Sequence, residues 1–252
     1  MVEARRWHRL GTPLVALTLL LAGGGVTAGA DYQGSVYSNV TAFDVCDGTP
    51  DTISTDIRLL ARDAFKTLGY KVTSFELSGF TKANVLKRNP ADAGAYVHSH
   101  GDFYGAGDIQ GFREDGDSCS QAIVYATEIK KGRKFPANLV VMSTCHLAEA
   151  PRGGYPAMSE AYGIEQLKSN PDGSRYRGNE FFLGYRGLAW TSDQLRFEGA
   201  FWAYATGGWN LGDAFVLALT HADLRMGSVP DWFGQYTYSG RPQPVPPCAT
   251  CL

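Results

Sequence analysis

Apolar and polar positions along the chain alternate between the periods of strands and helices. A β-branched and aromatic stretch at 34–43 is followed by apolar residues at helical spacing, and a second strand-like stretch at 71–77 comes directly after Gly69. The helical set consists of Ile53, Ile57, Leu60, Ala64 and Leu68. Strand, helix and strand in this order form the crossover unit from which parallel sheets are built.

Later segments continue the same alternation. The expected strands lie at 95–101, 138–145 and 180–190, a short segment at 81–88 fits a helix or a turn, and the expected helices lie at 192–208 and 211–226. Ser192 is the expected cap of the helix at 192–208, and Gly207-Gly208 closes it. The stretch at 138–145 is apolar without alternation, as in a strand covered by helices on both faces. The sequence therefore predicts an α/β fold, a three-layer α/β/α domain with a mainly parallel sheet in which 138–145 is central. The segment at 121–129 fits either an outer hairpin or a helix.

Composition and charge narrow the class of partner. The chain has 252 residues, of which 44% are hydrophobic and 19% charged, which is typical of a globular protein with one sizeable domain. The formal net charge is -2 and the pI is about 6.2. Because no basic field is present to attract phosphates, we expect no nucleic-acid partner.

The first thirty residues have the pattern of a signal peptide. Arg5, Arg6 and Arg9 form a basic start, 13–22 is apolar, and 28–30 supplies small residues for cleavage. An apolar run of this length is shorter than the about 20 residues that a spanning helix needs. We therefore expect a signal peptide at 1–30, a domain at 31–235 and an irregular Pro- and Cys-containing tail at 236–252. The mature protein is expected to be secreted, without a membrane partner. The pair Arg5-Arg6 leaves the export route open.

Export changes how the five cysteines are interpreted. Four of them stand in Gly-, Asp-, Ser- or Pro-rich surroundings that favour loops, and we expect these to form two disulfides whose pairing the sequence leaves open: Cys46, Cys119, Cys248 and Cys251. Cys145 follows an apolar strand, "LVVMSTC", so it is the cysteine expected to remain free.

Chemically active residues follow two of the expected strands. His100-Gly101 ends one apolar stretch and Cys145 ends the next strong one. In parallel sheets the site forms at the carboxyl ends of the strands, and neighbouring strands lie about 4.8 Å apart. If these two strands are neighbours, His100 and Cys145 face each other. A thiol and an imidazole in that arrangement suit acyl transfer, with the backbone amides of Gly101 and Cys145 as candidate oxyanion contacts.

These motifs resemble the caspase-like fold of cysteine peptidases, which includes caspases, gingipains and CHAT-domain proteins. The resemblance rests on "AYVHSHG" with His100, on "LVVMSTC" with Cys145, and on the later "GGWNLGDAFVLAL". It implies a caspase-like α/β domain in which Cys145 is the nucleophile and His100 the general acid/base. It also implies a peptide or protein substrate and no cofactor. Thr144 and Ser143 depart from the residues that many members carry before the cysteine, which leaves side-chain specificity open.

Two other functions remain open from the sequence. His98-x-His100-x-Asp102 resembles the opening of a zinc-hydrolase motif, for which His146 and His221 are further ligand candidates. The other possibility is a secreted binding module that keeps the fold without turnover. Against the zinc interpretation, His98 alone fits a buried strand histidine bonded within the fold.

Specificity is the least determined feature. A preference for a basic substrate side chain would need an acidic partner, and the candidates are Asp102, Asp108 and Asp193. Aromatic residues expected to line the same cleft are Phe103, Tyr104, Tyr185 and Trp190.

Overall fold

The computed structural model describes residues 32–41, 43, 48–116, 121–176, 178–224 and 227–244. The expected signal peptide and the end of the expected tail lie outside the described residues. So do Cys46, Cys119, Cys248 and Cys251, whose expected disulfides therefore stay predictions.

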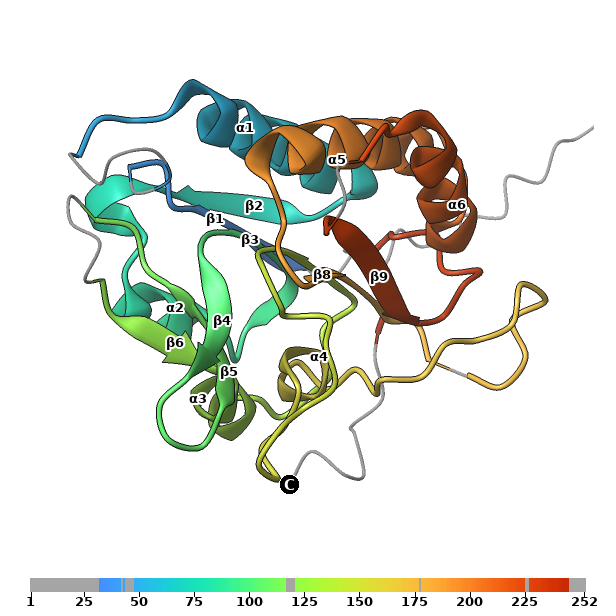
Figure 1. Ribbon diagram of the computed structural model, residues 1–252. Helices are drawn as coiled ribbons and strands as arrows, with labels where there is room; N and C mark the ends of the chain where they lie inside the picture. The colour runs from blue at the N-terminus through green and yellow to red at the C-terminus, as the bar shows by residue number, and fades with distance from the viewer. Residues whose placement is uncertain are drawn as a thin grey trace, which may run out of the picture. The chain divides into compact units, whose positions relative to one another are not determined.

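A mainly parallel sheet forms the centre of the described part of the chain (Figure 1). Its strand order is β2-β1-β3-β7-β8-β9, and only β9 runs antiparallel to its neighbour. The strands are β1 (Gln33–Ser38), β2 (Lys71–Phe75), β3 (Asp92–His98), β7 (Leu139–Ser143), β8 (Phe181–Arg186) and β9 (Val229–Gly234). The predicted central position of the 138–145 strand is confirmed, because β7 lies between β3 and β8.

Helices cover both faces of this sheet, as Figure 1 shows. One face carries α1 (Thr52–Leu68), α5 (Thr191–Thr206) and α6 (Leu211–His221), and the other carries α2 (Lys82–Arg88), α3 (Ala126–Gly132) and α4 (Met158–Ala161). Alternation along β7 supplies both cores, since Val141 packs with the first set while Val140 and Met142 pack with the second. The predicted three-layer α/β/α architecture is confirmed.

The long helix α1 begins and ends as its sequence requires. The Asp51 side chain accepts hydrogen bonds from the backbone N–H groups of Ile53 and Ser54, which would otherwise lack partners. Gly69 ends the helix in the left-handed region, at φ 105°. This fixed start of α1 matters for the site, because Ser54 reaches a histidine of the sheet.

Two local predictions need correction. Helix α5 begins at Thr191 with Trp190 in the cap position, so Ser192 lies inside the first turn and is not the cap. The strand expected at 95–101 stops at His98, and Gly101 instead begins a separate antiparallel sheet of β4 (Gly101–Tyr104), β5 (Ile109–Arg113) and β6 (Ile123–Tyr125). The segment at 121–129 contains both a strand, β6, and the start of α3. A short 3-10 turn, Leu77–Gly79, follows β2.

Strand β9 at the edge of the sheet has no counterpart in the sequence prediction. Pro230 and Asp231 interrupt the strand-like composition of this segment. Lys168 and Arg186 both form ion pairs with Asp231, and Gly234 exchanges backbone hydrogen bonds with Leu167 and Ser169. The edge is therefore covered by side chains and by a neighbouring loop.

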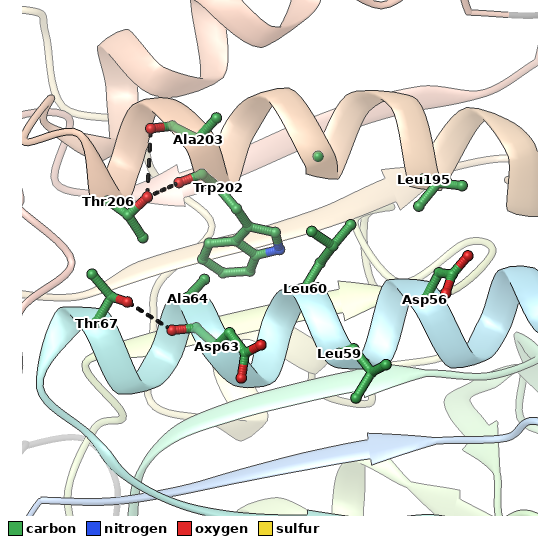
Figure 2. Close-up of a pocket in the computed structure, with 11 residues that line it drawn as sticks. Asp56, Leu59, Leu60, Asp63, Ala64, Thr67, Leu195, Trp202, Ala203 and Thr206 are labelled. Atoms are coloured by element: carbon green, nitrogen blue, oxygen red, sulfur yellow. Dashed lines mark hydrogen bonds between the residues drawn. The ribbon is translucent and has the colours of Figure 1, made fainter.

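A groove of about 590 Å³ runs between α1 and α5 (Figure 2). Leu60 and Leu195 form its walls, Trp202 lies between the two helices, and Gly199 leaves open space on α5. Its lining residues come from these two helices, and none is a candidate site residue. Across the described ranges, no helix combines the length and the apolar character that crossing a membrane requires.

Candidate active site at the carboxyl edge of the sheet

The register of β3 and β7 brings the two candidate catalytic residues to the same edge. The strands run parallel with Val97 opposite Met142 and His98 opposite Ser143. His100 and Cys145 each come two residues after that last pair. The sequence prediction that the two motif-bearing strands are neighbours is confirmed, whereas the catalytic roles of the residues stay predictions.

The backbone of Gly101 lies directly against the turn that carries Cys145. A Cβ atom at Gly101 would be 2.6 Å from the carbonyl oxygen of Cys145 and 2.9 Å from Cβ of Thr144. Neither distance is compatible with a side chain, and the first obstacle is backbone that cannot turn away. Glycine at this position is therefore required by the close approach of the two chain segments.

Cys145 is a half-buried free thiol. The backbone N–H of Ala189, just beyond β8, donates to its Sγ at 3.3 Å. Burial raises the pKa of the thiol, the Ala189 contact lowers it, and the charge of Asp102 raises it further, with a net rise. The resting group is therefore a protonated thiol, and attack on a carbonyl requires a base that removes its proton.

A strained residue follows Cys145. His146 has φ 63°, a left-handed conformation that non-glycine residues rarely adopt. Its Nδ1 lies 2.5 Å from a carboxylate oxygen of Glu149, and the same oxygen accepts from the N–H of Gly187 at 2.9 Å. The His146 N–H donates to the carbonyl of Gly187 at 2.9 Å. Glu149 thus fastens the turn after Cys145 to the end of β8.

The histidine that ends β3, His98, and the one two residues beyond it, His100, have different surroundings. His100 is half-buried, and its ring lies 4.5 Å from that of Phe43. His98 is fully buried, with Nδ1 3.2 Å from Oγ of Ser143 and Nε2 3.0 Å from Oγ of Ser54. Burial lowers the pKa of His98 to about 3, so this ring is neutral under ordinary conditions. His98 is the bonded strand histidine that its sequence context favoured.

The residues of the zinc alternative do not form one cluster. Both ring nitrogens of His98 have hydroxyl partners, His146 holds Glu149, and His221 lies on α6 beside Tyr204. Within the described ranges, no group of three or more His, Cys, Asp or Glu side chains has an arrangement that could hold a metal ion.

Two residues expected at the cleft are buried elsewhere. Tyr185 is completely buried and donates to Glu198 at 3.0 Å, and Asp193 is completely buried and bound by Arg196. Neither side chain is exposed to a substrate: Tyr185 packs in the core, and Asp193 is covered and bound by Arg196. The pattern of aromatic and acidic residues could not show this, since alternation places Tyr185 on the face of β8 that packs against α5.

The other candidates lie at the surface. Asp102 is exposed on β4 and Asp108 is exposed in the turn between β4 and β5. The Arg152 guanidinium lies 3.7 Å from the ring centre of Phe103, Tyr104 is partly buried, and Trp190 is 47% exposed. Asp102 is the acidic candidate whose charge reaches the Cys145 thiol.

Several residues that shape the site escaped the sequence analysis. They are Phe43, Glu149, Ala189 and Glu198. Only Glu198 had a signal in the sequence: it lies one helical turn before Phe201 and Trp202, so helical spacing places a glutamate on an apolar face of α5. The others had no local signal, since their importance comes from contacts between distant segments.

Among the comparisons with known proteins, the search of solved structures finds similar chains. A scan against protein-family models gives no match, and neither does a search of curated proteins. Among solved structures, the chain is similar to protein GSU0716 from Geobacter sulfurreducens, with 10% identity, a TM-score of 0.47, and coverage of 81% of this chain and 93% of that one. It is also similar to caspase-1 from Spodoptera frugiperda, with 14% identity, a TM-score of 0.45, and coverage of 81% and 87%.

Proposed function

We propose that the chain is a secreted cysteine endopeptidase of the caspase-like type, with Cys145 as nucleophile and His100 as general acid/base. The observation that supports it is the register of β3 and β7, which ends one strand before His100 and its neighbour before Cys145. The contact of the Gly101 backbone with the Cys145 turn supports the same assignment. The substrate is a peptide or protein, and bond cleavage needs no metal.

The chemistry follows from the state of the thiol. Because the pKa of Cys145 is raised, His100 takes the thiol proton as Sγ attacks the peptide carbonyl carbon. The carbonyl oxygen gains negative charge, for which the backbone N–H groups of Gly101 and Cys145 are the proposed donors. His100 then gives its proton to the departing amine, and water hydrolyses the thioester. Attack and proton removal are thus coupled in this mechanism.

Cleavage of a mixed peptide library by the purified protein tests the proposal. We expect cleavage that iodoacetamide abolishes and a metal chelator leaves unchanged. Cys145→Ala and His100→Ala should each reduce kcat by at least about a hundredfold, the scale of a lost general acid/base. His221→Ala is the matched control, because that histidine is exposed on α6 and should leave cleavage unchanged.

The contrary outcomes separate the alternatives. Cleavage that survives Cys145→Ala but disappears with chelator would establish metal hydrolysis instead. A folded wild-type protein that cleaves no peptide in any condition would favour the binding-module function. Circular dichroism of each variant shows whether lost cleavage reflects lost folding.

A further inference from the structure

Side chains beneath the candidate dyad connect it to the core. His98 is the last residue of β3 and His100 lies two residues beyond it, and the Phe43 ring contacts both imidazoles. The centroid of the Phe43 ring lies 4.6 Å from that of His98 and 4.5 Å from that of His100. On β7, Ser143 stands two residues before Cys145 and opposite His98. The way His98 is held can therefore influence both candidate catalytic residues.

The His98 ring bridges two buried hydroxyls. Nδ1 contacts Ser143 and Nε2 contacts Ser54 at the start of α1, and all three residues are completely buried. A neutral imidazole donates from one nitrogen and accepts at the other, whereas a hydroxyl can do both. The hydrogen bonds through Ser54, His98 and Ser143 can consequently run in either direction.

A carboxyl group lies at the other end of these bonds. Glu198 on α5 is 1% exposed and accepts from the hydroxyls of Tyr96 at 2.6 Å and Tyr185 at 3.0 Å. Ser143 lies on the same face of β7 as Val141, the face that packs against α1 and α5, and its hydroxyl acts to lower the pKa of the Glu198 carboxyl. Burial raises the pKa of Glu198 to about 7, although the three hydroxyls act to lower it. We call the connected set the buried chain; it consists of Ser54, His98, Ser143 and Glu198.

We propose that the buried chain is a proton relay whose direction reverses when Glu198 gains or loses its proton. With Glu198 ionised, Ser143 donates to the carboxylate and accepts from Nδ1–H of His98, whose Nε2 accepts from Ser54. With Glu198 protonated, its O–H donates to Ser143, which donates to Nδ1, and the ring proton lies on Nε2. His98 is neutral in both states and changes only its tautomer.

Each proton moves by one place in this exchange. The state with Glu198 protonated holds one proton more than the ionised state, and solvent supplies it. Because Ser54 is fully buried, this proton reaches its oxygen when the start of α1 opens transiently, and the Ser54 hydroxyl proton passes to Nε2 of His98. The Nδ1 proton passes to Ser143, and the Ser143 hydroxyl proton passes to Glu198. One proton enters at Ser54 and one O–H bond forms at Glu198, so the count balances and no group is oxidised or reduced.

The charged groups around the buried chain already have partners. Asp193, on the same helix as Glu198, acts on Tyr185 and is bound to Arg196. Asp51, the cap of α1, acts on His98 and accepts from the Ser54 N–H at 2.8 Å. From β3 and β8, the titratable groups facing Glu198 are Tyr96 and Tyr185. Burial is the main cause of the lowered pKa of His98; the Asp51 charge and the Ser143 backbone act to raise it, and His100 acts to lower it further.

Nitrogen NMR of the full chain labelled with ¹⁵N-histidine tests the relay, because the two neutral tautomers have different ring-nitrogen shifts. The His98 signals are those missing from a His98→Gln variant. Between roughly pH 5.5 and 8.5, the wild type should change from Nε2–H to Nδ1–H, with a midpoint near that of Glu198. Glu198→Gln should remove this midpoint, and Ser143→Ala should remove it while leaving Glu198 in place.

Glu180→Gln is the matched control. Glu180 is also a buried glutamate with a raised pKa and a tyrosine partner, Tyr176, but it precedes β8 at the opposite edge of the sheet. Its variant should titrate His98 as the wild type does. A wild-type His98 that keeps one tautomer throughout, or an identical midpoint in Glu198→Gln, would refute the relay.

The consequence for catalysis rests on the proposed function. If the protein cleaves peptides, kcat of the wild type should follow the His98 midpoint and kcat of Glu198→Gln should lose that inflection, while Glu180→Gln keeps it. If the protein cleaves nothing, the proposed function fails, but the NMR measurement still decides whether the relay exists.

Discussion

Gly101 and Cys145 approach so closely that a methyl group on the former would lie 2.6 Å from the carbonyl oxygen of the latter. This contact joins the first strand of the small antiparallel sheet to the turn after β7. The relative position of the two candidate motifs is thus fixed by backbone packing as well as by strand pairing.

Gly101→Ala should displace this turn. We expect a loss of about 1–3 kcal/mol in the free energy of unfolding, typical of overpacking, together with slower alkylation of Cys145. Chemical denaturation and mass-resolved alkylation measure the two effects. Gly199→Ala is the control: its Cβ would meet no atom within 4 Å, so it should stabilise α5 by up to about 1 kcal/mol. Equal behaviour of the two variants would contradict the close approach.

Asp102→Asn should make the Cys145 thiol more acidic. Burial is the largest cause of its raised pKa, but the Asp102 charge adds to it, so removing that charge lowers the pKa. At a fixed pH below the thiol pKa, alkylation should then be faster, and the difference should shrink in high salt. Asp108→Asn removes an exposed charge from the same hairpin and should leave the rate unchanged. A rate unaffected by Asp102→Asn would exclude this influence.

Glu149→Gln should loosen the turn after Cys145. Burial raises the pKa of Glu149, but the bonds from His146 and Gly187 outweigh it and leave the pKa lowered. The stability that this carboxylate contributes is therefore present above the ordinary glutamate pKa and is lost as the pH falls through the lowered one. We expect a cost of about 1.5–3 kcal/mol at neutral pH, as for hydrogen bonds to a charged group.

Denaturation of the Glu149→Gln variant at neutral and acid pH measures this effect. The difference from the wild type should shrink in acid. Glu76→Gln, which removes a surface partner of Arg58, serves as control and should change stability by less than about 1 kcal/mol. A Glu149→Gln deficit that is the same at both pH values would show that ionisation of Glu149 does not matter.

His98 should make the fold sensitive to acid. Its pKa is lowered by burial from 6.5 to about 3, so the unfolded chain binds more protons between these values. Stability through this group is therefore lost as the pH falls below about 6.5, by up to about 1.4 kcal/mol per pH unit. The contribution of Glu198 to stability has the opposite pH dependence: burial raises its pKa to about 7, so stability through this group is lost as the pH rises. The free energy of unfolding should fall less steeply with acid in His98→Gln than in the wild type, and parallel slopes would contradict this prediction.

Periodicity predicted most of the central sheet because its inner strands contain apolar runs and each connection carries a helix. Leu139, Val140, Val141 and Met142 form an unbroken apolar run that is completely buried, which is why the central position of β7 could be inferred. Strand β9 was not predicted because Pro230 and Asp231 weaken its strand pattern, although a proline is tolerated in an edge strand. The small sheet was concealed by its short strands.

The candidate site was predictable only where the chemistry sits at a strand end. His100 and Cys145 met that condition, whereas Glu149 and Phe43 act from other segments and had no motif. Tyr185 illustrates the opposite error. Its aromatic character suggested a cleft, but its strand position directs it toward Glu198 in the core.

The covered edge at β9 bears on behaviour at high concentration. An open strand edge can pair with another molecule and begin aggregation. Here Pro230 has no N–H to offer, and Gly234 is already bonded to Leu167 and Ser169. The Lys168 and Arg186 side chains, which form ion pairs with Asp231, lie beside the strand. We therefore expect that concentrated solutions of the folded protein do not form fibres through this edge. Replacing Pro230 and Asp231 by β-branched residues should allow the edge to pair with a strand of another molecule.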